Sequence, residues 1–185
     1  GKAQDAVSTL KRLADFINLM YFDKIGVHDP HSNVSTALIN HVVSVGAENE
    51  TAQVLETLED KNVILCYPDE GAAKRYSSQI GRDYVFCIKH RDWRTGKIER
   101  LELTTPEKVV GQNVLIVDDI CSRGGTFTFT AKALKEAGAG EIYLYVTHCE
   151  NTIFNGEILR DGLISHVFTT DSIYRGDHAN ITVLR

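Results

Sequence analysis

The sequence predicts an α/β protein whose sheet is mostly parallel and twisted, with helices on both faces. Two observations predict this class. Short apolar runs recur along the 185-residue chain, and segments whose apolar residues repeat at helical spacing separate many of them. A strand inside a parallel sheet is buried on both faces, so its sequence is apolar almost throughout. We therefore expect the functional loops at the carboxyl ends of the strands.

The chain opens with a predicted helix and a short strand. The helix follows from apolar residues at helical spacing, namely Leu10, Leu13, Ala14, Ile17 and Met20. Lys24–Asp29 then alternates and stops at Pro30, because proline cannot donate to a strand ladder. We expect a short helix over Val34–Val43 and a clearer one over Thr51–Leu58.

The middle of the chain supplies a strand–turn–helix unit and a second strand. Val63–Tyr67 is an apolar strand that ends at Pro68–Asp69, and a helix is predicted over Gly71–Ile80. Tyr84–Ile88 is another apolar strand, and the polar, basic segment Lys89–Arg100 follows it.

The remainder of the chain supplies four further strands and two helices. The expected strands are Val114–Val117, Ile142–Val146, Val167–Thr169 and Ile181–Leu184. Helices over Thr126–Ala137 and Asn151–Leu163 separate three of them. Strands that alternate with helices of this length require parallel crossovers, which supports the predicted class.

Composition excludes several classes of protein. The net charge is −5 and the pI is near 5.8, which argues against an electrostatic grip on nucleic acid or on an anionic membrane. The four cysteines are far apart and form no C-x-x-C pair, so neither a zinc site nor a disulfide framework is indicated, and a reducing cytoplasm fits best. The chain has no apolar run of membrane-spanning length, and its first residues lack the apolar core of a signal peptide.

The segment VLIVDDICSRGGTF holds the strongest functional signal. Asp118 and Asp119 follow an apolar strand, where two carboxylates can accept hydrogen bonds from vicinal sugar hydroxyls or help to hold a hydrated Mg²⁺. Gly124 and Gly125 allow backbone N–H groups to turn inward beside a helix N-terminus and form a phosphate cradle. The alternative is that the two acids end a strand and cap the next helix.

As a whole, this string resembles the phosphoribosyl-diphosphate motif of type I phosphoribosyltransferases and of ribose-phosphate diphosphokinases. It is not a Walker A loop, because no G-K-[ST] follows the glycines. The resemblance implies that the two acids bind the ribose hydroxyls and that the following loop binds the 5-phosphate. The implied sugar-phosphate residues are Asp118, Asp119, Cys121, Ser122, Arg123, Gly124, Gly125 and Thr126.

Two more segments are similar to the diphosphokinases in particular. YPDEGAAKR, Tyr67–Arg75, resembles their P-D-x-G-x-A-K-R stretch, which implies that Asp69 is an Mg²⁺ ligand; by itself the segment would be taken for a helix N-cap. DPHSN, Asp29–Asn33, matches their D-L-H-A-S segment at Asp29 and His31. This implies a catalytic and metal-binding role for His31 at the ATP·Mg²⁺ site, whereas without the resemblance a satisfied loop histidine is expected.

The basic segment Lys89–Arg100 lies where the diphosphokinases carry a flexible catalytic loop that begins K-x-R. Lys89 and Arg91 match that pair, and the resemblance implies that they neutralise charge as a diphosphoryl group moves. A solvated hairpin is the alternative for such a charge run. THCENTIFNG, near Thr147–Gly156, is similar to the family's T-H-G-x-F-x-G region, so the resemblance extends from about Ser8 to Arg185.

The resemblance implies a phosphoribosyltransferase-like fold, with residues 1–32 as the end of an N-terminal domain and 33–185 as a complete C-terminal domain. It implies transfer of the diphosphoryl group of ATP to the anomeric hydroxyl of ribose 5-phosphate, giving the 1-diphosphate and AMP, with Mg²⁺ as cofactor and a homo-oligomeric assembly. Ser122 and Arg123 depart from the family's D-D-x-x-D-T-x-G-T, which raises the hypothesis of a larger ester such as ADP-ribose as acceptor. A type I phosphoribosyltransferase and a non-catalytic regulatory paralogue are the alternative functions.

Overall fold

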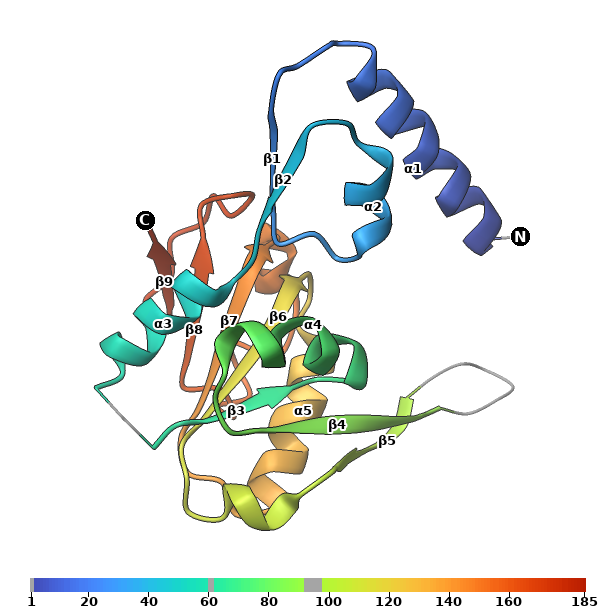
Figure 1. Ribbon diagram of the computed structural model, residues 1–185. Coiled ribbons are helices and arrows are strands. Elements are labelled where there is room, and N and C mark those ends of the chain that lie inside the picture. Colours follow the sequence, from blue (N-terminus) through green and yellow to red (C-terminus); the bar gives the residue numbers. More distant parts are fainter. Residues whose placement is uncertain (1, 60–61, 92–97) are drawn as a thin grey trace. The chain divides into compact units, whose positions relative to one another are not determined.

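A computed structural model describes residues 2–59, 62–91 and 98–185 (Figure 1). The chain forms two compact units, Gly1–Ala47 and Glu48–Arg185. The expected boundary after residue 32 concerns two related domains rather than compactness, and it stays a prediction. No helix in the described ranges is long and apolar enough to cross a membrane.

The first unit contains two helices and a small parallel sheet. Its elements are α1 (Lys2–Asn18), β1 (Ile25–His28), α2 (Asn33–Leu38) and β2 (Val42–Val45). β1 and β2 pair in parallel, with Ile25 opposite Val42. The helix expected over Val34–Val43 is therefore shorter than predicted, because its valine-rich end, Val42–Val45, favours an extended backbone.

The second unit is built on a seven-stranded sheet. Along the sheet the strands follow the order β5-β4-β3-β6-β7-β8-β9. Their bounds are Ile64–Tyr67 for β3, Tyr84–Arg91 for β4, Ile98–Leu103 for β5, Val114–Cys121 for β6, Ile142–Cys149 for β7, His166–Thr170 for β8 and Ile181–Leu184 for β9. Every neighbouring pair is parallel except β4 and β5, which are antiparallel. The predicted, mostly parallel sheet is confirmed.

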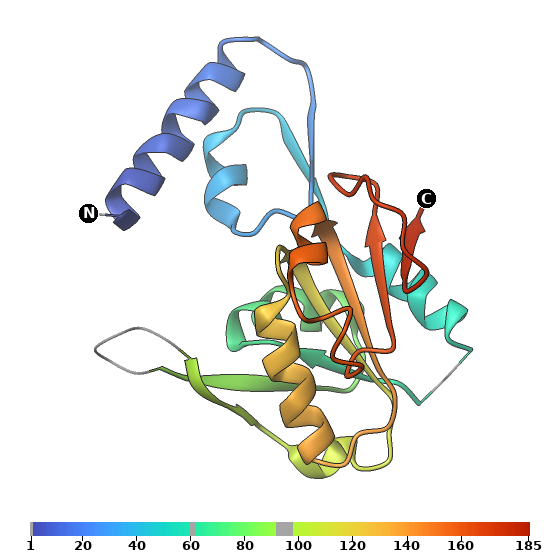
Figure 2. The same cartoon turned by 180° about the vertical axis from the view of Figure 1, so that it is seen from behind.

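Helices cover both faces of this sheet, as predicted. α5 (Gly125–Glu136) lies on one face, and α3 (Glu48–Thr57) and α4 (Glu70–Ile80) lie on the other, as Figures 1 and 2 show from opposite sides. The central strands β6 and β7 are buried almost throughout, and α5 packs Phe127, Ala131 and Leu134 into the same core. Burial on both faces accounts for the apolar runs in these strands.

In the second unit, the structure differs most from the sequence prediction at three elements. β6 continues to Cys121 rather than ending at Val117, and β5 was not predicted. The helix expected over Asn151–Leu163 is wrong: only Asn151–Asn155 is helical, as a short 3₁₀ turn. Gly156 stops that turn in an extended conformation, because there the chain passes against the loop that follows β6.

Candidate functional site

Two strand–loop–helix units lie side by side at one edge of the sheet. β3 leads into α4, and β6 leads into α5. β3 and β6 are paired in parallel, with Ile64 opposite Val114, so both strands point the same way. Carboxyl ends of parallel neighbours meet at the same edge, which brings Asp69 and Asp118 to the same side of the second unit.

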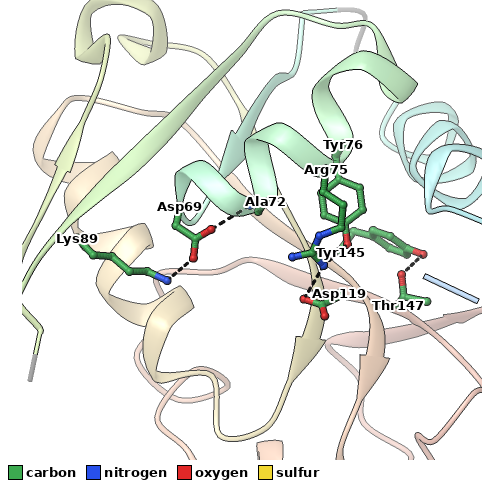
Figure 3. A network of polar contacts seen from close by, with 8 residues as sticks. All are labelled: Asp69, Ala72, Arg75, Tyr76, Lys89, Asp119, Tyr145 and Thr147. Atoms are coloured by element: carbon green, nitrogen blue, oxygen red, sulfur yellow. Dashed lines mark hydrogen bonds and ion pairs between the residues drawn. The ribbon is translucent and has the colours of Figure 1, made fainter. Parts of the chain in front are cut away.

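The first residue group of the site surrounds Asp69, the N-cap of α4. Its Oδ1 accepts a hydrogen bond from the Ala72 N–H at 2.9 Å, and its Oδ2 lies 2.6 Å from the Nζ of Lys89 (Figure 3). Burial opposes ionisation of this carboxyl, but the hydrogen bonds from Lys89 and Ala72 outweigh it and lower the pKa of Asp69. Asp69 is thus an ionised carboxylate that holds a cation.

Lys89 reaches Asp69 from the neighbouring strand. It lies in β4, which pairs with β3, and its side chain is largely buried, with 17% exposed. A cavity of about 520 Å³ opens beside the pair and is lined in part by Gly71, Phe86 and Ile88. A volume of this order is enough for a small ligand. Another cavity, of about 490 Å³ between α3 and α4, contains neither Asp69 nor Lys89, so we place the site at the first.

The second residue group is the loop between β6 and α5. Gly124 begins the helix in a left-handed conformation, with φ of 79°, and no side chain caps the helix. A Cβ on Gly124 would come within 2.7 Å of Ile158, and a Cβ on Gly156 would come within 1.9 Å of the Arg123 carbonyl oxygen. Only glycine fits these two places, and the loop is held in a shape that leaves the first N–H groups of α5 without a capping side chain.

The two acids at the end of β6 lie in different surroundings. Asp119 is buried, with 3% exposed, and its Oδ1 lies 3.2 Å from the Arg75 guanidinium, which also stacks over the Tyr76 ring (Figure 3). Asp118 is partly exposed. Burial and the neighbouring Asp119 carboxylate raise the pKa of Asp118 to about 8. Asp118 is therefore the more accessible of the two to a sugar, and at neutral pH it holds a proton.

Arg75 is a site residue that the sequence analysis missed. It lies in α4 and reaches across to β6, so it joins the two strand–loop–helix units through Asp119. The available signal was the arginine that ends the A-K-R part of YPDEGAAKR. Nothing in that local pattern says which acid the arginine would meet.

The remaining predicted loop residues differ in accessibility. Ser122 and Arg123 are exposed, Gly125 is exposed, and Thr126 is partly buried at the start of α5. The Cys121 side chain is buried, so a ligand would meet only its main chain. Its hydrogen bond with the Cys149 thiol and its burial raise the pKa of Cys121, which therefore stays a neutral thiol.

For two predicted catalytic residues, Arg91 and His31, the structure does not describe where the side chain lies relative to this site. Arg91 ends β4, but its side chain lies outside the described part of the chain, as do residues 92–97 of the predicted catalytic loop. Lys89 and Arg91 belong to strand β4, and β4 and β5 form an antiparallel hairpin. His31 belongs to the first unit, so its role at an ATP·Mg²⁺ site stays a prediction.

The implied cofactor, Mg²⁺, can be tested against the residues at Asp69. Mg²⁺ binds through one or two carboxylates together with water and substrate phosphates. Asp69 Oδ2 already contacts a cation, so its charge and position suit a magnesium ligand. No three His, Cys, Asp or Glu side chains converge on a common metal position among the described residues, so phosphates and water would have to supply the other ligands. With that completion, Asp69 fits Mg²⁺.

Comparison with known proteins defines the class of this fold and site. Residues 46–157 match the phosphoribosyl transferase domain, and the chain belongs to that family. The matched range contains α4, β6 with its loop, and α5, which are the elements that build the site.

Within this family the chain is similar to ribose-phosphate pyrophosphokinases, another name for the diphosphokinases. It is 28% identical to the protein from Sulfurisphaera tokodaii over 99% of this chain and 63% of that protein. It is 35% identical to the one from Pyrococcus abyssi over 70% of this chain and 45% of that protein. The chain thus spans between 45% and 63% of the length of these two relatives.

A solved structure shows the same fold. The crystal structure of phosphoribosylpyrophosphate synthetase from Mycobacterium smegmatis superposes with a TM-score of 0.76 at 21% identity, covering 95% of this chain and 59% of that one. The recognition from the sequence, as the C-terminal part of a ribose-phosphate diphosphokinase, is confirmed at the level of family and fold.

Proposed function

We propose that this chain carries the sugar-phosphate and diphosphoryl-transfer part of a diphosphokinase. The acceptor is ribose 5-phosphate or an ester of it such as ADP-ribose, and the donor is ATP. The observation that carries this proposal is the meeting of two features at one sheet edge: an α5 N-terminus without a capping side chain, and the Lys89–Asp69 pair beside a cavity. The first suits a phosphate and the second suits a polyphosphate with its metal.

The loop between β6 and α5 would hold the sugar phosphate. Backbone N–H groups at a helix start attract anions through unpaired donors and the helix dipole. Arg123 is exposed beside them and supplies a positive charge. Asp118, near the end of β6, would bind a ribose hydroxyl. Asp119, which pairs with Arg75, would help to hold Asp118 in position.

Lys89 would act on the group that is transferred. In the reaction the anomeric hydroxyl oxygen bonds to the β-phosphorus of ATP, the bond from that phosphorus to the oxygen shared with the α-phosphorus breaks, and AMP leaves. The hydroxyl proton is released. Negative charge moves onto the leaving oxygen, and an ammonium group placed there stabilises it. Lys89 would leave Asp69 for the polyphosphate, and Asp69 would then be available to Mg²⁺, which when bound neutralises the phosphates.

Arg91 and His31 are proposed on resemblance alone, as a second cation near the moving phosphoryl group and as a residue on the ATP side. ATP and the sugar phosphate are the proposed partners, and a cytoplasmic homo-oligomer remains the expected setting. A ribosyl acceptor with a larger 5-substituent is the variant of this function that Ser122 and Arg123 favour, because they replace an acid and a threonine of the family's motif.

Release of AMP from ATP tests the proposal. AMP is measured with ribose 5-phosphate, with ADP-ribose, and without a sugar phosphate, and formation should depend on one of the sugars. Lys89→Ala should lower the rate by at least about 100-fold while sugar-phosphate binding changes little, because Lys89 meets the moving group rather than the ribose. A transferase would instead consume the 1-diphosphate together with a base, and a regulatory paralogue would bind without turnover.

Lys74→Ala is the matched control. Lys74 lies in α4, but its side chain is 73% exposed and pairs with Glu70 in the preceding turn. We expect its AMP formation to equal that of the wild type. Equal losses in the two lysine variants would show that Lys89 has no special role.

A further inference from the structure

The ion pair between Arg75 and Asp119 joins α4 to the end of β6. The Arg75 Nη1 lies 3.2 Å from the Asp119 Oδ1, and only 22% and 5% of the two side chains are exposed. The same guanidinium stacks over the Tyr76 ring at 5.1 Å from its centroid, so a second contact holds it in position. Figure 3 shows the guanidinium reaching from α4 to Asp119. The contact is therefore a largely buried one, unlike an ion pair in solvent.

Of the two elements that the pair joins, α4 is held in place by other contacts. Ala72, Ala73 and Tyr76 of this helix are buried. Burial of apolar side chains keeps the helix against the sheet without help from Arg75. A buried ion pair adds little net stability over apolar side chains of similar volume, so its particular effect is to fix the direction of the carboxylate. Arg75 thus fixes the Asp119 side chain relative to a helix that is already in place.

The direction of Asp119 matters because its neighbour Asp118 is the proposed ribose ligand. Successive side chains of a strand point to opposite faces of the sheet. Val114 and Ile116 belong to the core that α5 covers, so the alternation along β6 places Asp118 on that face. Asp119 lies on the other face, where Arg75 meets it. The two acids are therefore directed apart, and Asp118 is left on the face of the phosphate loop.

Loss of the Arg75 charge would change both acids. Asp119 is only 3% exposed, and without the counter-ion that Arg75 supplies, so buried a carboxylate takes up a proton or turns toward water. If Asp119 takes up the proton, the negative charge of the acid pair moves to Asp118. If Asp119 turns toward water, its carboxylate approaches the open side on which Asp118 would meet the ligand. In both cases Asp118 no longer presents the same group to a ribose hydroxyl.

We infer that Arg75 is a positioning residue of the sugar site: it holds the Asp119 carboxylate against α4 and thereby keeps Asp118 as the group that meets the ribose hydroxyls. On this inference Arg75 acts through Asp119 and not by contact with the sugar. The inference rests on the proposed function, since it concerns the same sugar-phosphate site. It adds that recognition of the ribose depends on the neighbouring strand–loop–helix unit, the one that begins its helix at Asp69.

NMR titration with ribose 5-phosphate and with ethyl phosphate tests this. Both ligands are phosphate monoesters of similar charge, but ethyl phosphate has no hydroxyl group for Asp118. The wild type should bind ribose 5-phosphate more tightly. In Arg75→Met, the affinity for ribose 5-phosphate should fall about fivefold to tenfold, whereas that for ethyl phosphate should change by less than about twofold, because the phosphate loop is not altered.

Two further variants separate position from charge. Lys74→Met removes a positive charge from the preceding residue of α4, whose side chain is 73% exposed, and should leave both affinities unchanged. Arg75→Lys keeps a positive charge for Asp119 and should recover part of the lost affinity for ribose 5-phosphate.

A double variant covers the case in which Arg75→Met does not fold. Arg75→Met/Asp119→Asn removes both charges of the pair together, which destabilises a protein less than leaving one of them buried alone. It should lose the preference for ribose 5-phosphate over ethyl phosphate, because nothing then directs the side chain at position 119 toward α4. Thermal unfolding of each variant confirms that the titrated protein is folded.

The outcomes distinguish this inference from the function on which it rests. If the wild type prefers ribose 5-phosphate and neither Arg75→Met nor the double variant loses that preference, the role of Arg75 is overturned and the proposed sugar site stands. Equal weakening of both ligands also overturns it, since Arg75 would then only attract anions. If the wild type binds ribose 5-phosphate no more tightly than ethyl phosphate, the proposed hydroxyl contact fails as well. A preference that is lost in Arg75→Met but kept in Lys74→Met supports the inference.

Discussion

α4 and α5 begin at the same edge of the sheet but begin in different ways. α4 starts at Asp69, an extended residue whose own carboxylate accepts a hydrogen bond from the Ala72 N–H. α5 starts at Gly124, a left-handed residue that provides no capping side chain. The carboxylate at the start of α4 repels anions and satisfies a donor, whereas the start of α5 keeps its donors for a ligand. On the proposed function, the start of α5 is the one that would hold a phosphate.

The carboxyl groups that precede these helices also differ. Lys89 and the Ala72 N–H overcome the effect of burial on Asp69 and lower its pKa. Burial and Asp119 raise the pKa of Asp118. One acid is therefore an ionised cation ligand, and the other is a neutral group able to donate a hydrogen bond to a sugar oxygen. On the proposed function, the two similar strand–loop–helix units would serve two different parts of the ligand pair.

The largest expected effect on stability comes from replacing Gly124, the residue before α5. Gly124→Ala places a methyl group against Ile158 at a left-handed position, and we expect the free energy of unfolding to fall by about 2 to 4 kcal/mol. Gly81→Ala is the control, because Gly81 is also left-handed but has open space around its Cβ; about 1 kcal/mol is expected there. Denaturant unfolding measures both.

The same two variants also test whether the loop before α5 binds the sugar phosphate. Sugar-phosphate binding should weaken at least about tenfold in Gly124→Ala and stay unchanged in Gly81→Ala, because only the first displaces the phosphate loop. Equal stabilities of the two variants would contradict the close packing between Gly124 and Ile158.

The next largest effect is a change of stability with pH, which the proton on Asp118 causes. The folded state keeps the Asp118 proton up to about pH 8, whereas the unfolded chain releases it near the usual value of about 4. Between these values the folded state binds more protons, so this group makes stability fall as the pH rises. Below about pH 4 both the folded and the unfolded state hold this proton, so the effect of Asp118 on stability no longer changes with pH.

Asp118→Asn removes this dependence. Relative to the wild type, the variant should gain stability progressively from pH 5 to pH 8, measured by urea unfolding at each pH. Asp171→Asn, at an exposed carboxylate, should show a constant difference over the same range. A constant difference for Asp118→Asn as well would mean that the proton is not retained.

The smallest effect concerns the capped helix. Asp69→Ala removes the cap of α4, so it should be less stable by about 1 kcal/mol than Asp69→Asn, which keeps a capping oxygen. Both variants lose the carboxylate next to Lys89, so both should lower AMP formation. If asparagine were as destabilising as alanine, the hydrogen bond to Ala72 would not be what stabilises the start of α4.

Much of the fold could be predicted from local patterns, and the failures have local causes. Strands that are covered on both faces are apolar along their length, which makes them recognisable in the sequence; here these are β3, β6, β7 and β8. β5 lies at the sheet edge with alternating polar residues, so it has no such mark. The segment after Asn151 has apolar residues at helical spacing, but its close approach to Arg123 requires an extended Gly156.

By itself, the sequence determined the fold class and the family, and it predicted the place of a phosphate loop, because apolar runs, an acid pair and two glycines act within a few residues of one another. Only the tertiary structure decided the partner of each acid. Lys89 reaches Asp69 from the next strand, and Arg75 reaches Asp119 from a helix. Charge pairing depends on distance in space, and the order of strands in a sheet sets that distance.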